Sequence, residues 1–254
     1  MTLAKSVIVA KTDLKMALQV SYVRYGLIVI AAVGPVMILA IVGLLAFTTT
    51  STMELMVVMQ LMGPTISPML GIVAIIPASL IAANALVGER EQNTLEPLLC
   101  TPLTDRELLV GKVLSSFIPS IILLLGSLLI SEVGSFILLT TAGHPAMLIP
   151  DAAGLFFLLT SGPVMILAMN AIMILISGKV KRVYEAYQVS GASVMIFIIP
   201  MILPLMTMDP SGMIDPNSFW FSSMITLLIA LVLFVVSWGL AFGRFNRDTM
   251  VSRV

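Results

Sequence analysis

The chain has 254 residues, of which 59% are hydrophobic and 10% charged, and its mean hydropathy is +1.12. These values lie far outside the range of soluble globular domains and indicate an integral membrane protein. The single cysteine excludes a disulfide framework within the chain, and the single histidine excludes a metal site built from several histidines.

Residues 2–24 mix apolar and charged side chains ahead of the first long apolar run. Leu14 and Leu18, for example, interleave with Lys11 and Lys15. This mixture is typical of an amphipathic helix that lies in the membrane interface, and we assign that helix to residues 1–25. The alternative is a basic leader that only directs membrane topology. A cleaved secretory signal is not expected, since the apolar run that follows is too long and starts too late.

Six apolar runs are long enough to cross a membrane as helices, because a hydrocarbon core of roughly 30 Å needs about 20 apolar residues. None of the runs contains Lys or Arg. They cover residues 26–47, 66–87, 113–137, 154–177, 189–207 and 219–242. We therefore predict an all-α integral membrane protein, with one six-span domain over residues 1–254 and an external loop at 208–218.

All 13 Lys and Arg residues fall on one side of this six-span layout. They precede the first run, separate the second from the third and the fourth from the fifth, or follow the sixth. The other side carries Glu54, His144, Asp151, Asp209 and Asp215. Cytoplasmic loops of membrane proteins are rich in Lys and Arg. The layout therefore predicts a multi-pass protein with both termini in the cytoplasm, and we expect it in the plasma membrane of a prokaryotic cell.

The longest predicted cytoplasmic loop covers residues 88–112. Thr104 and Glu107 have the spacing of a capping box, so we expect a helix to begin after Thr104 and to run into the third span. Before it, the charged arm 89–91 precedes a short helix through Leu98 and Leu99. An apolar face on a short cytoplasmic helix needs a protein to cover it.

The run E-R-E-x-N-T-L-E-x-L-L-x-T-P-L-T-x-x-E-L-L-x-G-K at 89–112 resembles the loop between the second and third spans of the ABC-2 family of transporter permeases. In that family this loop forms a coupling helix that docks into an ATPase. Asn93 departs from the pattern, because it stands where Gly is usual, although Asn tolerates left-handed backbone geometry. The resemblance assigns ATPase docking to Glu89, Arg90, Glu91, Thr94, Leu95, Glu96, Leu98 and Leu99.

A weaker resemblance at 177–191 is to the family's loop between the fourth and fifth spans, and it assigns a second cytoplasmic contact to Lys181 and Arg182. The resemblance implies two permease subunits, identical or related, paired with two ABC ATPase subunits, and export more often than import. No phosphate-binding G-x-x-x-x-G-K-[ST] loop occurs, since Gly111-Lys112 is followed by Val113. We therefore expect a non-catalytic subunit that binds no cofactor of its own, while ATP and Mg²⁺ bind the partner ATPase. We expect it to contact membrane lipid and not nucleic acid.

Two other classes stay open: a passive channel or sensor subunit, and an intramembrane enzyme. An enzyme would need several ionisable groups at membrane depth, and Glu132 is the only acidic residue inside a predicted span. Glu132, near the outer interface, and Asn170, deeper in the fourth span, either pair helices or line a translocation path. No catalytic residue and no catalytic metal site are predicted.

Methionine recurs at every third position in Met53, Met56, Met59 and Met62, just before the second span. Thioethers suit Cu(I), so a site for a soft metal is one reading of this spacing. The alternative is ordinary packing, because Met is a flexible apolar filler and the chain holds 19 of them.

Overall fold

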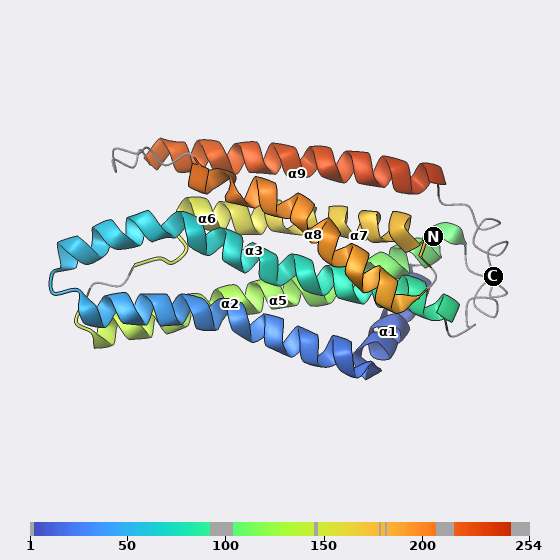
Figure 1. Ribbon diagram of the computed structural model, residues 1–254, viewed down its shortest axis with the longest axis horizontal. Helices are drawn as coiled ribbons and strands as arrows, with labels where there is room; N and C mark the ends of the chain where they lie inside the picture. The colour runs from blue at the N-terminus through green and yellow to red at the C-terminus, as the bar shows by residue number, and fades with distance from the viewer. Residues whose placement is uncertain are drawn as a thin grey trace.

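The computed structural model describes residues 3–91, 104–144, 147–177, 179–180, 182–206 and 216–244. Every regular element in these ranges is a helix, which confirms the all-α fold class (Figure 1). The helices are α1 (Leu3–Gln19), α2 (Ser21–Thr48), α3 (Thr52–Glu91), α5 (Asp105–Thr141), α6 (Ala152–Phe156), the π-helix η1 (Phe157–Ser161), α7 (Gly162–Ser177), α8 (Val183–Met206) and α9 (Pro216–Arg244).

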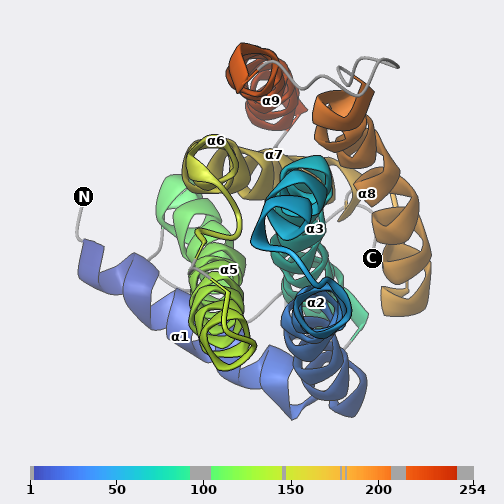
Figure 2. The same ribbon diagram turned by 90° about the vertical axis from the view of Figure 1, so that its left-hand side faces the viewer.

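The long helices run side by side along one axis, and α1 lies across them at one end (Figures 1 and 2). The C-terminal end of α9 reaches that same end of the bundle (Figure 1). The predicted short helix through Leu98 and Leu99 lies outside the described residues, as does most of the predicted external loop 208–218, whose last three residues belong to α9.

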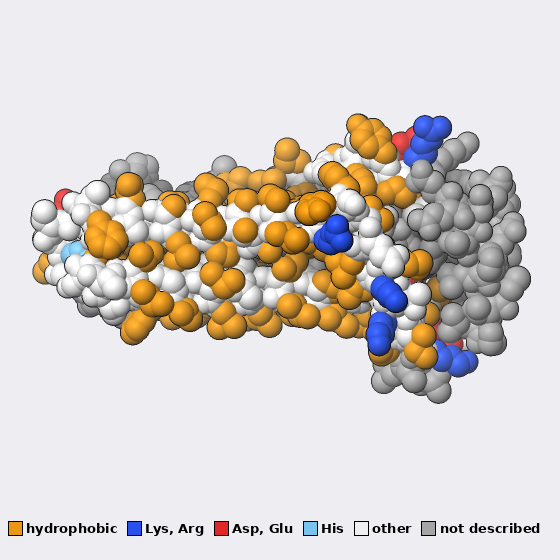
Figure 3. Space-filling model, turned by 90° about the horizontal axis from the view of Figure 1, so that it is seen from below, with side chains coloured by type: hydrophobic (Ala, Val, Ile, Leu, Met, Phe, Trp, Pro, Cys, Tyr) orange, Lys and Arg blue, Asp and Glu red, His pale blue; other side chains and the backbone are white. Residues whose placement is uncertain are grey.

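Helix α3 is the centre of the bundle. It packs against α2, α5, α7 and α8, and 83% of its apolar stretch Ile66–Ala85 is buried. The corresponding values are 28% for α2 and 22% for α9, whose exposed side chains are large and apolar, such as Ile28 and Leu228. Figure 3 shows such side chains covering the length of the bundle. A belt of this kind is stable against lipid and not against water.

In the part of the chain that the structure describes, five helices are long and apolar enough to cross a membrane. They are Ser21–Thr48, Ile66–Ala85, Glu107–Thr141, Ala152–Ser177 and Phe219–Ala241. The predicted span 189–207 falls in α8, whose described apolar part, Val183–Ile199, is shorter. The structure therefore supports a multi-pass membrane protein, while the count of six spans stays a prediction.

The fourth predicted span is a helix with a change of pitch near its start. Residues Phe157–Ser161 form one π turn, in which the Gly162 N–H bonds to the Phe157 carbonyl. The next residue is Pro163, which has no N–H to donate, and π turns often take up such a break in the helical hydrogen bonds. By contrast, Pro35 and Pro119 lie inside α2 and α5 without ending them.

Helix α1 covers most of the predicted N-terminal segment, but it ends at Gln19, and Ser21–Arg24 already belong to α2. Its buried side chains recur at helical spacing on one face that packs mainly on α5. They are Ser6, Val9, Ala10, Asp13 and Ala17. The opposite face exposes Lys11 and Lys15 beside Val7 and Leu18. Lysine ammonium groups beside apolar side chains suit the boundary between lipid and water.

The serines of α5 are buried at helical spacing, as the pattern Ser127, Ser131 and Ser135 suggests. The hydroxyls of Ser127 and Ser131 bond within α5 and not to neighbouring helices. Ser127 donates to the Leu124 carbonyl at 2.9 Å and Ser131 to the Ser127 carbonyl at 2.7 Å, both within α5. These serines therefore provide small side chains that let neighbouring helices approach closely.

Candidate functional site

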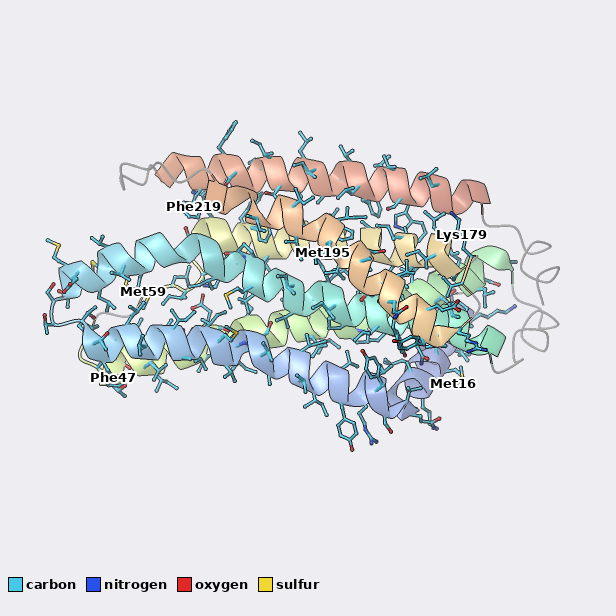
Figure 4. All side chains as sticks on the ribbon, in the orientation of Figure 1. Met16, Phe47, Met59, Lys179, Met195 and Phe219 are labelled. Atoms are coloured by element: carbon cyan, nitrogen blue, oxygen red, sulfur yellow. The ribbon has the colours of Figure 1, made fainter. Side chains whose placement is uncertain are left out.

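The charged side chains of the described residues divide between the two ends of the bundle. Figure 3 shows the Lys and Arg side chains toward one end of the bundle and the chain's single His at the other. Figure 4 places Lys179 and Met16 toward the end with the Lys and Arg side chains, away from Phe47 and Met59. The basic residues whose side chains the structure describes are Lys5, Lys11, Lys15, Arg24, Lys112, Lys179 and Arg182. We call this the cationic end.

The predicted docking loop leaves the bundle at the cationic end. Glu89, Arg90 and Glu91 are the last turn of α3, although their side chains are not described, and Thr94 to Leu99 lie outside the described residues. The predicted capping box is confirmed. The Thr104 hydroxyl accepts from the Glu107 N–H at 3.3 Å, and the Glu107 carboxylate accepts from the Thr104 N–H at 3.1 Å. A fixed start of α5 therefore follows the loop.

A buried ion pair fastens α1 to α3 and α5 next to this loop. Lys112 Nζ lies 3.5 Å from Asp13 Oδ2 and donates a 2.7 Å hydrogen bond to the Ala85 carbonyl of α3. The two side chains are only 7% and 3% exposed. The preceding Gly111 has no room for a side chain, since a Cβ there would lie 2.8 Å from Val9 Cβ and 2.9 Å from the Ser6 carbonyl oxygen. The two helices that flank the docking loop, α3 and α5, are thus both held to α1.

The second predicted contact lies at the start of α8. Arg182 is exposed, and its carbonyl accepts the first helical hydrogen bond from the Ala186 N–H at 3.1 Å. Lys181 lies outside the described residues. The position of Arg182 at the cationic end is compatible with a contact to the same partner as the docking loop.

A groove of about 740 Å³ lies between α2 and α8, with α3 as its floor. In the part of the chain that the structure describes, both walls pack against α3 but not extensively against each other. Ile76, Ser79 and Leu80 form the floor. Wall residues such as Tyr25 and Met195 are 60% and 63% exposed, so the groove opens on the outer surface of the bundle.

The described residues that line the groove are uncharged, and one end of the groove is aromatic and has a cation beside it. The rings of Tyr22 and Tyr187 lie 5.0 Å apart, one on each wall. The guanidinium of Arg24 lies 5.0 Å from the ring centroid of Tyr25, in a cation–π contact. The Ser79 hydroxyl donates to the Ile76 carbonyl of its own helix at 2.7 Å. Apart from the hydroxyls of the three tyrosines, few polar atoms are left to recognise a hydrophilic molecule.

Neither predicted path residue lines the groove. Asn170 is 1% exposed, and its side-chain oxygen accepts a 2.9 Å hydrogen bond from the Ser116 hydroxyl, which links α7 to α5. Glu132 accepts a 3.5 Å hydrogen bond from the Ile149 N–H, in the connection before α6. Both contacts join parts of the bundle. A role of either residue in a translocation path stays a prediction.

The methionines at the start of α3 do not share an exposed face. Met53 and Met56 are 78% and 42% exposed, whereas Met59 is 5% exposed, and the side chain of Met62 is not described. Within the described ranges there is also no group of three or more His, Cys, Asp or Glu that could hold a metal ion. These exposures suit packing better than one thioether site.

Sequence reasoning missed the groove and the ion pair. The walls of the groove come from residues about 160 positions apart, and the partners of the ion pair are 99 positions apart. One clue to the groove was available. Three of the chain's four tyrosines line it, beside the ends of the first and fifth predicted spans that lie toward the cationic end, and aromatic residues of membrane proteins gather at the ends of spans.

The family model described as ABC-2 family transporter protein matches residues 5–211. No curated protein matches the chain. The match covers more than half of the sequence and includes all but the first two residues of α1, the docking loop, the connection before α8 and all three helices of the groove. Membrane subunits of this family are permeases of ABC transporters and generally partner with ABC ATPases. The resemblance drawn from the loop is thereby confirmed, and the chain belongs to the ABC-2 family of transporter proteins.

Proposed function

We propose that this chain is the permease subunit of an ATP-driven exporter and that its 87–107 loop docks a separate ABC ATPase, which binds ATP and Mg²⁺. The observation that carries the proposal is the construction of the cationic end. Helix α3 has 40 residues, about 60 Å at 1.5 Å per residue, and its apolar run ends at Val87. The helix therefore continues to Glu91 beyond the apolar zone and delivers the loop to that end.

The cationic end faces the cytoplasm of a prokaryotic cell in this proposal, because cytoplasmic segments are enriched in Lys and Arg. The chain's single cysteine, Cys100, lies in the loop and provides a direct test. A membrane-impermeant maleimide should label it only after the membrane is opened. In a Cys100→Ser background, Glu54→Cys at the other end of α3 should be labelled in intact cells. Labelling of Cys100 in intact cells would contradict this orientation.

Helix α3 connects the docking loop to the floor of the groove. The same helix carries Glu91 at its last turn and Ile76, Ser79 and Leu80 in the floor of the groove. Movement of the loop when the ATPases bind ATP would displace this floor, because a continuous helix moves largely as a rigid element. A second permease subunit, identical or related, would complete the path. Since the groove lies in the cationic half, cargo would load from the cytoplasmic side.

Copurification separates this proposal from a channel or sensor subunit. A tagged chain, extracted in mild detergent, should retain an ABC ATPase, and the double variant Leu95→Glu/Leu99→Glu should lose it while still inserting into the membrane. Glu54→Lys is the control, because it alters charge at the opposite end. A chain that never retains an ATPase would favour the channel or sensor. Equal retention by the double variant would reject the 87–107 loop as the docking element.

A further inference from the structure

We propose that the end of the bundle opposite the cationic end binds one divalent cation, with Ca²⁺ as the best fit, between Glu132, Asp151 and Ser67. The proposal goes beyond the transporter function, because it involves neither the docking loop nor the groove. It rests on a buried carboxylate oxygen and a buried hydroxyl, both without a hydrogen-bond partner among the described residues, beside the same short connection before α6.

Only one oxygen of the Glu132 carboxylate has a partner in the part of the chain that the structure describes. Its Oε2 atom accepts a long hydrogen bond of 3.5 Å from the Ile149 N–H, whereas its Oε1 atom is buried and accepts none. An unpaired buried charge is strongly unfavourable. The described Lys and Arg side chains lie toward the cationic end, so none of them neutralises this carboxylate (Figure 3). The charge must be balanced by a proton or by a cation from outside the protein.

Ser67 on α3 brings a second buried oxygen to the same connection. Its side chain is 5% exposed, and its hydroxyl has no hydrogen-bond partner among the described residues. A Cβ on Gly154 would touch this hydroxyl and would also lie 2.9 Å from Asp151 Oδ1, so the two oxygens are near neighbours. Asp151 Oδ1 accepts the Gly154 N–H at 2.9 Å. The Asp151 side chain is exposed, so an ion can reach the site from water.

The oxygens converge on a few residues of one segment. Glu132 of α5 bonds to Ile149, and Asp151, two residues later, lies beside Ser67 of α3. Carboxylate, hydroxyl and backbone carbonyl oxygens are the ligands of hard cations. Ca²⁺ accepts such ligands in irregular geometry, whereas Mg²⁺ demands a near-ideal octahedron. Because these donors come from three separate elements, Ca²⁺ fits them better, and water would complete its coordination.

The cation would fasten the connection before α6 to α3 and α5. Two carboxylates are few for a metal site, which predicts weak binding, in the range of about 0.1–1 mM that extracellular Ca²⁺ modules show. In the orientation of the proposed function, this end of the bundle faces the outside of the cell. Only that placement rests on the proposed function.

Trp220 provides a spectroscopic reporter for the site. Its ring centroid lies 5.6 Å from that of Phe156, in the helix that Asp151 caps. The chain's other tryptophan, Trp238, lies 18 positions further along α9, about 27 Å at 1.5 Å per residue. Tb³⁺ takes the oxygen ligands of Ca²⁺ and luminesces when a nearby tryptophan transfers energy to it. An ion at the site should therefore receive energy from Trp220 and not from Trp238.

The experiment measures Tb³⁺ luminescence on the full-length permease in neutral detergent, after a chelator has removed bound ions. Excitation of tryptophan should give a signal that Ca²⁺ displaces at about 0.1–1 mM and Mg²⁺ only at higher concentration. Trp220→Phe should lose most of this signal, and Trp238→Phe should keep it.

Two substitutions remove charge from the site without removing its hydrogen bonds. Glu132→Gln can still accept from the Ile149 N–H, and Asp151→Asn remains a good N-cap. Each should weaken Ca²⁺ binding by at least about tenfold, and Ser67→Ala should weaken it by about threefold. Glu54→Gln, exposed in the first turn of α3, is the matched control, because it removes the same charge at the same end of the bundle. In chelator alone, Glu132→Gln and Asp151→Asn should unfold at no lower temperature than the original chain, which separates lost binding from lost fold.

Three results would overturn the inference. Absence of a Tb³⁺ signal that Ca²⁺ displaces would mean that a proton balances Glu132. Equal Ca²⁺ affinity of Glu132→Gln and Glu54→Gln, or a full signal in Trp220→Phe, would place the ion elsewhere. Displacement by Mg²⁺ and Ca²⁺ at the same concentration would remove the preference for Ca²⁺. Copurification of the ATPase requires no Tb³⁺ or Ca²⁺, so its failure would instead count against the proposed transporter.

Discussion

Lys112→Met removes the positive charge from the buried contact of α1 with α3 and α5. At 3.5 Å from Asp13, and with an effective dielectric constant of about 20, the attraction is about 5 kcal/mol before the cost of desolvation. The variant also loses the 2.7 Å hydrogen bond to the Ala85 carbonyl. Loss of one partner from a buried ion pair costs about 3–5 kcal/mol, and we expect that cost to appear as detachment of α1.

Cysteine labelling measures this detachment. Ser6 is 2% exposed on the face of α1 that packs on α5, and Ser6→Cys in a Cys100→Ser background changes little in size. Since about 1.4 kcal/mol is a factor of ten, Lys112→Met should speed maleimide labelling of that cysteine by roughly a hundred- to several-thousand-fold. A cysteine at Met16, which is 38% exposed, should react at an unchanged rate.

A double variant isolates the role of the charges. Asp13→Leu combined with Lys112→Met replaces both by apolar side chains of similar size, and such replacements are often neutral or stabilising. Labelling at position 6 should therefore return close to its original rate. If Lys112→Met leaves that rate unchanged, or if the double variant labels as fast as the single one, the ion pair does not hold α1 in place.

Three smaller substitutions test the packing around the loop and the core. Gly111→Ala should lower the stability of the α1 contact by about 1–3 kcal/mol and speed labelling at position 6, because its Cβ would lie 2.8 Å from Val9 of α1. Gly126→Ala, whose Cβ would meet nothing within 4 Å, should be neutral or slightly stabilising. Equal effects of the two variants would refute the close contact. Ser116→Ala should lower the free energy of unfolding in micelles by about 0.6 kcal/mol through its lost bond to Asn170, and a cost above about 2 kcal/mol would imply a further role. Thr104→Ala should cost about 1 kcal/mol and speed amide exchange in the first turn of α5, while Thr104→Ser should not; unchanged exchange would mean that the capping box contributes nothing.

Local patterns made much of the fold predictable. The apolar runs coincide with long helices because a membrane span must satisfy its backbone hydrogen bonds internally, which leaves helix as the only conformation for such a run. The start of α5 was equally readable, since Thr104 and Glu107 are three positions apart and interact within one turn. The end of α1 at Gln19 was not, because the mixed composition continues to Arg24 without a break.

Contacts between distant segments could not be predicted in the same way. Lys112 was noted only as part of a loop motif, and nothing local marks Asp13 as its partner. Gly111 gave no local sign that α1 would cross it at close range. The contact of Asn170 was partly predictable. A buried amide within a span predicts a hydrogen bond, but only the packing of α7 on α5 identifies Ser116 as the donor.

ATP hydrolysis by the copurified ATPase, measured with permeases altered at the two ends of α3, tests the central claim most directly. Glu91 ends the helix at the docking loop and Glu54 lies in its first turn, so Glu91→Lys and Glu54→Lys make the same change of charge at opposite ends of one element. Docking through the loop predicts that Glu91→Lys reduces hydrolysis to the rate of the ATPase alone and that Glu54→Lys leaves the stimulated rate unchanged. Full stimulation by both variants would contradict docking at this loop.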